Sequence, residues 1–395
     1  MTKYDFLYNV PEEICPGSYH HNDNIVQASA KILIKLRKHD ELVCCAQMQS
    51  GKTDVMRRLV YLINTYNVKI AKLDLAINQC NIYVILCASS INLKMQLKSK
   101  LPEIENNIYH LNDINTFRKN VPEYVQLFIK MADSSLIIFD ECHCDAEVKG
   151  LVDEFRKLLA KYAALSQTSF KRIGFSATPY EQIAINYPKV IMYPGDHYYG
   201  LVSIFNSLTS GRPIIFQAKN LYEPNECAEL FEEIGIHNYY YIIRLANTKV
   251  NEQQIIVNME KQMKARKISF DSYVYDMSYA KSINELIDTR PAKPVLIYLK
   301  DKLRMGEYLN TKYVYMVHDD PTNTYTHTTA QSLLGRCCGY NKKSHHTIIY
   351  CDLEKAYQHY EWIINDYSRD YLPGNAKYLT MYYGKIKPNC IYTEN

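Results

Sequence analysis

The residues best suited to chemistry in this 395-residue chain form a short polar loop near its N-terminus. The loop runs from Ala46 to Thr53 with the sequence Ala-Gln-Met-Gln-Ser-Gly-Lys-Thr, between an apolar run and a helical pattern. Backbone N–H groups at such a strand-to-helix turn bind phosphates. The Lys52 ammonium would reach the β- and γ-phosphates of a nucleoside triphosphate, and the Thr53 hydroxyl would bind Mg²⁺. The contributing N–H groups would be those of Gln49, Ser50 and Gly51.

Two adjacent carboxylates are the second chemical feature. The apolar run Leu136–Phe139 predicts a buried strand, and Asp140 and Glu141 follow it directly. Open α/β sheets bind ligands at the carboxyl ends of their strands. Asp140 is suited to hold Mg²⁺ through its water shell, and Glu141 to orient and deprotonate an attacking water. Alone, each motif has a simpler interpretation, a chance Gly-Lys-Thr or a charged turn; together they predict a triphosphate hydrolase.

Short apolar runs alternate with helical patterns around these motifs, which is typical of parallel sheets with crossover helices. The first half has four expected strands, Leu42–Ala46, Ile82–Ala88, Leu136–Phe139 and Ile173–Phe175. Its expected helices are Asn24–Arg37, Thr53–Asn64 and Ile91–Leu101. The second half repeats the pattern, with strands at Tyr239–Ile243, Ser272–Tyr275, Val295–Leu299, Tyr313–Val317 and Thr347–Tyr350 and a helix at Asn251–Arg266. The predicted fold class is therefore α/β, with two tandem domains.

A looser segment, rich in turn-forming proline and glycine, separates the two halves. We assign residues 1–186 to the first domain, 187–236 to the inter-domain connection and 237–395 to the second domain.

Composition limits the other possibilities. Hydrophobic residues make up 47% of the chain and charged residues 22%, which is the globular range. We see no membrane-length apolar run and no signal core, so we expect a soluble, intracellular protein without a membrane partner. The 12 cysteines predict neither disulfides nor zinc, because several lie in strands and Cys142-His143-Cys144 is too tight for a ligand pair. A net charge of +4 permits nucleic-acid binding without arguing for it.

The acidic motif resembles a known family signature. Asp140-Glu141-Cys142-His143 is similar to the DExH box of superfamily 2 helicases. The triplet Ser-Ala-Thr after the strand Ile173–Phe175 resembles the motif that couples ATP hydrolysis to the nucleic-acid site in that superfamily. The resemblance implies two tandem RecA-like domains, each a mostly parallel sheet flanked by helices, with ATP and Mg²⁺ as cofactors. The residues to which it gives a coupling role are His143, Ser176, Ala177 and Thr178.

Two more resemblances concern the ATP site. Gln27, on the first expected helix, is similar to the glutamine that recognises adenine, although a surface glutamine is the simpler alternative. The segment from Gln331 to Tyr340 resembles the sixth motif, Gln-x-x-Gly-Arg-x-x-Arg, which implies that Gln331 is catalytic and that Arg336 is an arginine finger. One extra residue precedes the Gly-Arg pair, and Gly339 replaces the second arginine.

The match extends from Gln27 to Cys351 and is most specific in the first half. Alanine at the first loop position is also common in helicases. Three stretches have residues similar to those of helicases of large DNA viruses and bacteriophages. They are the loop, the sixth motif and the segment from Pro294 to Gly306.

Superfamily 2 motors hold a strand mainly through its phosphates, so the resemblance implies a nucleic-acid partner. We expect DNA in preference to RNA, a choice that the sequence leaves open. Hydroxyls, amides and arginines suit phosphate oxygens. The candidates for these contacts are Ser89, Asn92, Thr116, Arg244, Arg304 and Gly306.

Three functions remain open on the sequence. The first is an ATP-dependent helicase or translocase, and the second is a double-strand translocase or annealing motor that never unwinds. The third is a nucleic-acid-binding scaffold with an impaired ATPase, for which Gly339 is the supporting feature. The sequence leaves the polarity, oligomeric state and pathway undefined.

Overall fold

The computed structural model describes most of the chain, and each statement below concerns the described residues. They are 5–8, 22–66, 69, 73, 75, 77, 81–87, 91–111, 113, 121–143, 151–211, 213–245, 249–276, 278–279, 281–300, 308–320, 326–340 and 347–374. The chain forms two compact units. Among the described residues, the first contains those up to His197 together with Asp366–Leu372, and the second contains Tyr198–Asn365 together with Pro373 and Gly374.

The first unit is built on a six-stranded sheet whose paired strands are all parallel. The spatial order is β3-β2-β4-β5-β1-β6. The strands are β1 (Glu41–Ala46), β2 (Ile82–Leu86), β3 (Ile108–His110), β4 (Leu136–Asp140), β5 (Lys171–Ser176) and β6 (Lys189–Met192). The phosphate-loop strand β1 is separated from the acidic-pair strand β4 by β5 alone. All three strands therefore end at the same edge of the sheet.

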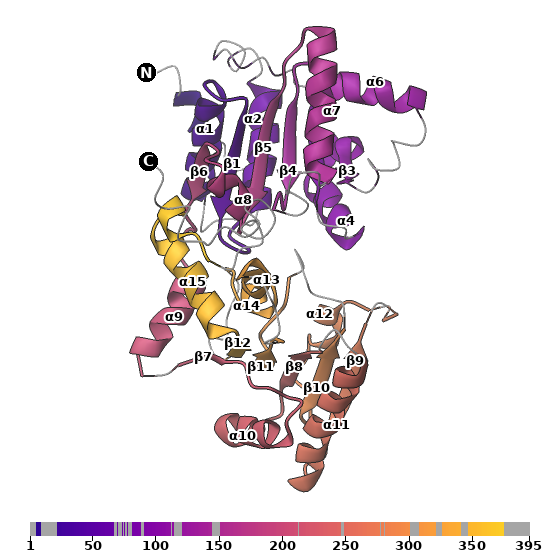
Figure 1. Cartoon of the computed structure of the whole chain (residues 1–395), viewed down its shortest axis with the longest axis vertical. Coiled ribbons are helices and arrows are strands. Elements are labelled where there is room, and N and C mark those ends of the chain that lie inside the picture. Colours follow the sequence, from indigo (N-terminus) through magenta and orange to yellow (C-terminus); the bar gives the residue numbers. More distant parts are fainter. Residues whose placement is uncertain are drawn as a thin grey trace. The chain divides into compact units, whose positions relative to one another are not determined.

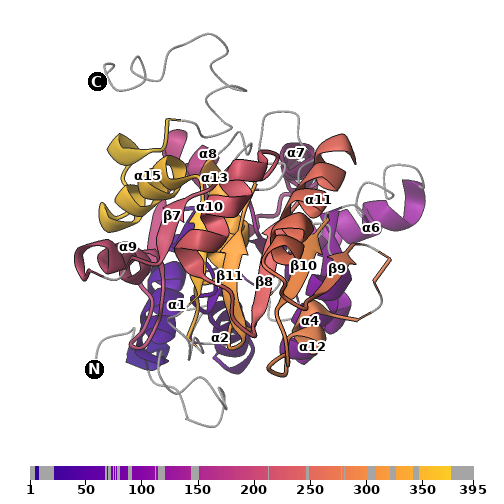
Figure 2. The same ribbon diagram turned by 90° about the horizontal axis from the view of Figure 1, so that it is seen from below.

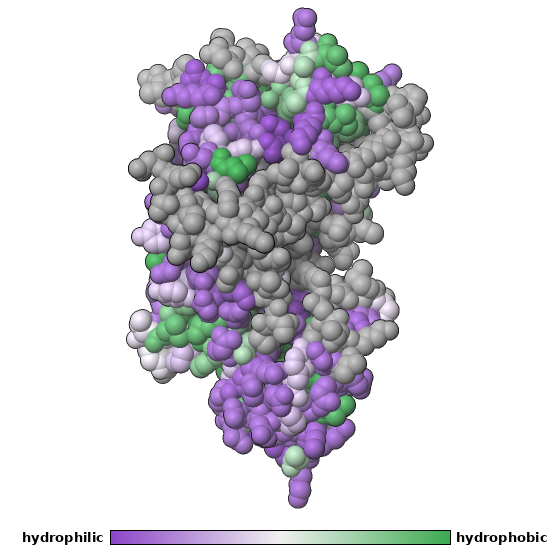
Figure 3. All heavy atoms as spheres, viewed as in Figure 1, coloured by the Kyte–Doolittle hydropathy of each residue, from purple (hydrophilic) through white to green (hydrophobic). Residues whose placement is uncertain are grey.

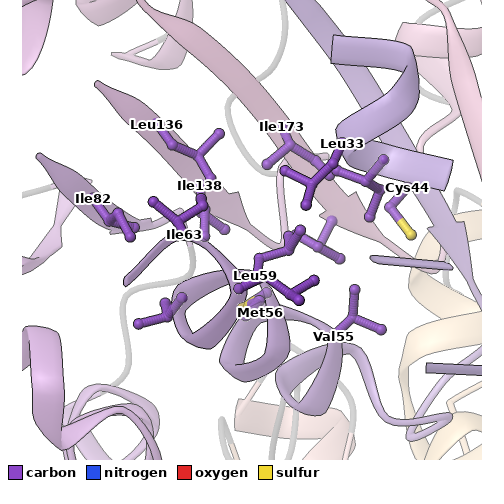
Figure 4. Packing of buried hydrophobic residues seen from close by; sticks show 14 of the residues in the cluster. Leu33, Cys44, Val55, Met56, Leu59, Ile63, Ile82, Leu136, Ile138 and Ile173 are labelled. Atoms are coloured by element: carbon purple, nitrogen blue, oxygen red, sulfur yellow. The ribbon is translucent and has the colours of Figure 1, made fainter. Parts of the chain in front are cut away.

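Helices cover both faces of this sheet (Figure 1). They are α1 (Asn22–Leu36), α2 (Lys52–Thr65), α4 (Ile91–Lys100), α6 (Val121–Ala132), α7 (Leu151–Ser166) and α8 (Tyr180–Ala184), with 3-10 turns η1 (Asp5–Leu7) and η3 (Pro102–Asn107). Helices α1, α2 and α4 pack on one face, where side chains such as Leu33, Met56 and Leu59 meet Ile138 and Ile173 (Figure 4). On the other face Phe155 of α7 contacts Phe139. Removing this apolar surface from water holds the strands in place.

The second unit contains another six-stranded parallel sheet, in the order β7-β12-β11-β8-β10-β9. Its strands are β7 (Ile215–Gln217), β8 (Tyr240–Arg244), β9 (Asp271–Tyr275), β10 (Val295–Leu299), β11 (Val314–His318) and β12 (Ile348–Cys351). Its helices are α9 (Leu201–Thr209), α10 (Pro224–Ile234), α11 (Lys249–Ala265), α12 (Ile283–Leu286), α13 (Thr326–Gln331), α14 (Leu333–Arg336) and α15 (Leu353–Ile364). Two parallel sheets flanked by helices confirm the predicted fold class of two tandem RecA-like domains.

One face of the second sheet is covered by α10 and α11, seen side by side in Figure 2. Phe231 of α10 and Met259 of α11 join Tyr241 and Tyr298 in this core. The outer surfaces of the two helices are mostly hydrophilic (Figure 3), with Val257 of α11 as an exposed apolar residue. This division into an apolar inner face and a polar outer face explains the helical pattern in the sequence.

The segment 187–236, assigned from the sequence to the inter-domain connection, contains regular structure. Strand β6 pairs with β1 in the first unit, and β7 pairs with β12 in the second. Helices α9 and α10 lie between β6 and the first long strand of the second unit, β8. The passage between the units falls at His197 and Tyr198.

The chain returns to the first unit after α15. The returning residues Asp366–Leu372 include the 3-10 turn η4 (Arg369–Tyr371). The ammonium of Lys189, on β6, donates to the carbonyl oxygens of Asp366 and Tyr367 at 2.7 Å each. Tyr193 donates from its hydroxyl to the Asp366 carboxylate at 2.7 Å. Tyr367 is 2% exposed and is therefore buried in the first unit, whereas Asp366 and Arg369–Tyr371 are exposed. In the described part of the chain, no helix is long and apolar enough to cross a membrane.

Candidate nucleotide-binding site

The predicted phosphate loop joins the buried strand β1 to helix α2. Gln49 and Gly51 both have positive φ angles, of 54° and 102°. Ser50 is fully buried, and its hydroxyl donates to the Gln47 carbonyl at 2.7 Å. The Gly51 carbonyl accepts from the N–H groups of Asp54 and Val55, which begins the helix. A side chain at Gly51 would strain this turn, so glycine is required by the backbone as well as by close approach to a ligand.

Lys52 connects this loop to the acidic pair. Its ammonium lies 3.2 Å from the Glu141 carboxylate, and both side chains are nearly buried, at 12% and 10% exposure. Lys52 is the first residue of α2, and Glu141 follows β4 with a φ of 53°. The structure thus brings together the lysine and the carboxylate that the sequence selected from motifs almost ninety positions apart. In a nearly buried pair of this kind, each charge neutralises the other.

Asp140 is the more deeply enclosed of the two carboxylates. It is the last residue of β4, and its backbone carbonyl accepts from the Cys87 N–H at 3.1 Å. Its side chain accepts from the Glu141 N–H at 3.1 Å. Burial, and then the neighbouring charge of Glu141, raise the pKa of Asp140 to about 7, although Lys52 opposes the shift. The site therefore favours an added positive charge next to Asp140.

A divalent cation meets this requirement. Sites for Mg²⁺ commonly use one or two carboxylates together with phosphate oxygens and waters. The Asp140 carboxylate supplies one such ligand at the sheet edge. Thr53, the second residue of α2, would supply its hydroxyl from the end of the loop. The donor set of buried carboxylate, hydroxyl and nucleotide phosphate therefore fits Mg²⁺.

A polar network connects the acidic motif to the Ser-Ala-Thr triplet. The His143 Nδ1 atom lies 2.9 Å from the Ser176 hydroxyl and 3.4 Å from the Glu141 carboxylate. Ser176 accepts from the Thr178 N–H at 3.0 Å, so its own proton can be donated to His143. Ser176, Ala177 and Thr178 are at most 1% exposed. The four residues with a predicted coupling role are thus close together at the end of β4 and β5.

Two residues that support the acidic turn were not selected from the sequence. The Gln182 side chain, on α8, donates to the Cys142 carbonyl at 2.9 Å. Gly174, on β5, faces Cys142 so closely that an added Cβ would lie 2.6 Å from its sulfur atom. A glycine inside a strand often marks close packing of this kind, and that was the available signal.

Several other candidates of the first unit are outside this cluster. Gln27 is exposed on α1. Asn92 lies in the first turn of α4, and its side chain is not described. Ser89 and Thr116 lie outside the described residues, as do Arg304 and Gly306 in the second half of the chain. Their proposed contacts with nucleic acid remain predictions.

In the second unit, the residues of the sixth-motif resemblance are buried. Arg336 ends the short helix α14 and is 4% exposed, and its guanidinium donates to the Gln331 carbonyl at 2.9 Å. Gly339 has a φ of 136° and forms a two-bond antiparallel bridge with Tyr199. Glycine at this position therefore serves the backbone.

Arg244, a predicted phosphate contact, is engaged inside the same unit. Its Nε atom donates to the Asp319 carboxylate at 2.8 Å, with side-chain exposures of 8% and 2%. Its predicted contact with nucleic acid is untested, but the observed partner is a buried carboxylate.

Comparison with known proteins identifies a relative. No family model matches the chain. The chain is 54% identical over 390 residues to uncharacterized protein L594 of Acanthamoeba polyphaga mimivirus, covering 99% of this chain and 100% of that protein. The chain therefore belongs to the same protein family as this mimivirus protein.

Several solved helicase structures are also similar to the chain at low sequence identity. The Escherichia coli DEAH/RHA helicase HrpB is 13% identical with a TM-score of 0.48, over 85% of this chain and 43% of that one, so the chain spans less than half of HrpB. A Saccharomyces cerevisiae Dbp5 variant bound to RNA and ADP–BeF3 is 13% identical with a TM-score of 0.44, over 88% and 91%. The DUF1998 helicase MrfA bound to DNA is 15% identical with a TM-score of 0.48, over 90% and 51%.

Proposed function

We propose that the protein is an ATP-driven nucleic-acid helicase or translocase of superfamily 2, of the DExH type. The observation that carries the proposal is the 3.2 Å contact between Lys52 and Glu141, which joins the phosphate loop to the acidic pair at one sheet edge. Asp140 adds a second carboxylate at the same place. A lysine, two carboxylates and a strand-to-helix loop are the parts that phosphoryl transfer needs.

The proposed reaction is hydrolysis of ATP to ADP and phosphate. A bound triphosphate competes with Glu141 for the Lys52 ammonium and so frees the carboxylate for water. Glu141 then accepts a proton as the water oxygen attacks the γ-phosphorus and the bond to the β-phosphate oxygen breaks. Mg²⁺, held by Asp140 and Thr53, would neutralise phosphate charge. Gln49, Ser50 and Gly51 hold the phosphates through their backbone N–H groups.

The network of His143 and Ser176 supports a coupling role. His143 lies within 3.4 Å of the Glu141 carboxylate, so a change in that carboxylate alters a neighbour of the Ser-Ala-Thr segment. A segment buried at the end of β5 can move only as the packing around it rearranges. We assign to these residues the transfer of the hydrolysis signal to the nucleic-acid strand.

Gln331 and Arg336 are the proposed contribution of the second unit to catalysis, with Arg336 as the arginine finger. The impaired-ATPase scaffold is less well supported, because Gly339 occupies a positive-φ position in a hydrogen-bonded bridge. The missing second arginine therefore has a backbone explanation. Gln27 is proposed to recognise adenine.

The proposed track is a nucleic-acid strand bound through its phosphates, with DNA favoured over RNA. A viral relative supports a viral origin, with activity in an infected cell. Strand separation and movement along duplex DNA without unwinding are both compatible with the site. Displacement of a labelled strand supports the first activity, and clearance of a bound roadblock without displacement supports the second.

The proposal is tested by phosphate release from ATP, measured alone and with single-stranded DNA, duplex DNA or RNA. Wild type should be stimulated by at least one polymer, and the best polymer identifies the track. Lys52→Ala should abolish turnover, and Arg336→Ala should lower kcat by about 10³-fold or more. Lys161→Ala, a change of an exposed lysine on α7, is the matched control and should leave turnover unchanged. Polymer binding without turnover in wild type would favour the scaffold.

A further inference from the structure

A buried carboxylate in the second unit organises the segment that carries Arg336. Asp319 follows β11 and is 1% exposed. Its Oδ1 atom accepts from Arg244 Nε at 2.8 Å, from the Ser332 hydroxyl at 2.9 Å and from the Asp320 N–H at 3.2 Å. Its Oδ2 atom accepts from the Leu333 N–H at 3.2 Å. Both oxygens of Asp319 are thus used.

The bonds to Ser332 and Leu333 fix the beginning of α14. This helix is a single turn, Leu333–Arg336, and Ser332 is its N-cap residue. The Ser332 side chain makes no capping bond of its own and donates to Asp319 instead. A single helical turn has little intrinsic stability, so its position depends on such tertiary contacts. Asp319 supplies the cap from a distant part of the chain.

Arg336 is attached to this same turn at two points. Its N–H donates to the Ser332 carbonyl at 3.3 Å, and its guanidinium donates to the Gln331 carbonyl at 2.9 Å. The two accepting carbonyls belong to the residue that Asp319 binds and to the residue before it. A displacement of Ser332 would therefore change both the backbone and the side chain of Arg336.

We propose that Asp319, held in place by Arg244, is a positioning residue that aims Arg336 for catalysis. The inference rests on the proposed role of Arg336 as an arginine finger. It also gives Arg244 a function inside the second unit, in place of contact with a strand. An aspartate is required because both of its side-chain atoms must accept: in asparagine the amide nitrogen would face either the Leu333 N–H or the donors Arg244 and Ser332.

The test compares kcat and KM for ATP in four single variants. Asp319→Asn removes the accepting charge, and Ser332→Ala removes one bond while leaving the ion pair with Arg244 intact. Asp352→Asn and Ser207→Ala are matched controls in the same unit, because Asp352 caps α15 and the Ser207 hydroxyl bonds the backbone of Ile204 and Ile214. Thermal unfolding of each variant identifies loss of folding, and Ser332→Ala keeps the test usable if Asp319→Asn is unstable.

We expect kcat to fall about tenfold in Ser332→Ala and about 100-fold in Asp319→Asn, with KM for ATP nearly unchanged. Displacement of Arg336 should lower the rate of the chemical step. KM for ATP should stay nearly unchanged because the proposed phosphate-binding loop lies in the other unit. The controls should retain wild-type kcat. The conservative variant Ser332→Thr keeps a hydroxyl and should therefore retain most of the wild-type kcat.

The decisive measurement is a double-mutant cycle with Arg336→Ala. If Asp319 and Ser332 act through Arg336, their variants will cause no further loss in the Arg336→Ala background. Fully additive losses, or a normal kcat in both single variants, would overturn the positioning role. A wild-type kcat in Arg336→Ala itself would instead contradict the proposed role of Arg336, so the two failures are distinguishable.

Discussion

Asp140 shows how strongly the environment of one residue can set its charge. The carboxyl group is buried at the end of β4 beside Glu141, and both factors raise its pKa. Its protonated form is therefore favoured in the free protein below about pH 7. Binding of a cation reverses this preference, because positive charge favours the ionised form. If Asp140 holds Mg²⁺ as proposed, binding of the cation should release a proton from this residue.

The raised pKa of Asp140 predicts a pH dependence of stability. The folded-state pKa is about 7, above the value of about 3.9 for an unfolded aspartate, so between these values the folded state binds more protons. The contribution of Asp140 to the free energy of unfolding is therefore fully present below about pH 4 and declines as the pH rises toward 7. Asp140→Asn should remove the decline and stabilise the nucleotide-free protein by roughly 4 kcal/mol at pH 8. Chemical denaturation from pH 5 to 8 measures this.

Asp133→Asn is the matched control for this experiment, because Asp133 is exposed and lies outside the site. A profile for Asp140→Asn identical to wild type would show that Asp140 is ionised throughout. ATP turnover by Asp140→Asn should be lower than that of wild type, because the asparagine cannot hold Mg²⁺ as a carboxylate does.

Glu141→Gln should separate nucleotide binding from hydrolysis. The amide keeps the shape of the side chain but cannot accept the proton of water, so kcat should fall by about 10²–10⁴-fold. The affinity for ATP should be retained or increased, because Lys52 loses its competing partner. Equilibrium binding of a fluorescent ATP analogue and single-turnover hydrolysis measure the two effects. Equal loss of both would contradict the role of Glu141 as a base.

Sequence motifs were informative at this scale where chemistry requires particular residues. The loop and the acidic pair lie together because each follows a strand of one parallel sheet, and Lys52 contacts Glu141. Asp319 was missed, because an aspartate after a strand carries no distinctive spacing. Its role depends on Arg244 and Ser332, which lie 75 and 13 positions away.

Among the elements, β5 depends on a close contact with the acidic turn. A methyl group at Gly174 would lie 2.6 Å from the Cys142 sulfur and 2.9 Å from its Cβ. Gly174→Ala should therefore displace the turn that carries Glu141 and destabilise the first unit by about 1–3 kcal/mol. The midpoint temperature of thermal unfolding and the rate of ATP turnover should both decrease.

Gly374 is the matched control, because an added Cβ there meets nothing within 4 Å. Gly374→Ala should leave stability and turnover near wild type. Cys142→Ala combined with Gly174→Ala should recover part of the loss by removing the sulfur atom. If Gly174→Ala alone proved neutral, the contact between β5 and the acidic turn would not constrain the site.

The expected elements were accurate where burial produced a long apolar run. Strand β10 was predicted with its observed bounds, and β4 and β8 within one residue. Strands β3, β6 and β7 were not predicted, and each has only three or four residues at or near a sheet edge. Such short strands carry little pattern, and their pairing with a neighbouring strand determines them.

Over the whole molecule, the returning segment Asp366–Leu372 is a structural part of the first unit. Tyr367 is buried beside β6, whereas Tyr371, four residues later, is 49% exposed. Tyr367→Ala should lower the free energy of unfolding of the first unit by about 3 kcal/mol, because a large buried ring is removed. Tyr371→Ala is the matched control and should have little effect.

Denaturant titrations can measure this change. Limited proteolysis would show which unit has lost stability, because the first unit of Tyr367→Ala should be cleaved before the second. Equal stability of the two variants would show that the returning segment contributes little.

The returning segment also has a consequence for biosynthesis. The main part of the second unit, Tyr198–Asn365, is continuous in sequence, but it is translated before the segment Asp366–Leu372 of the first unit. Roughly 170 residues separate His197 from Asp366, which corresponds to about 10–30 s at about 5–20 residues per second. During this interval the first unit is already synthesised, but the segment that packs beside β6 is not. Full maturation of the nucleotide-binding half would therefore follow translation of the other half.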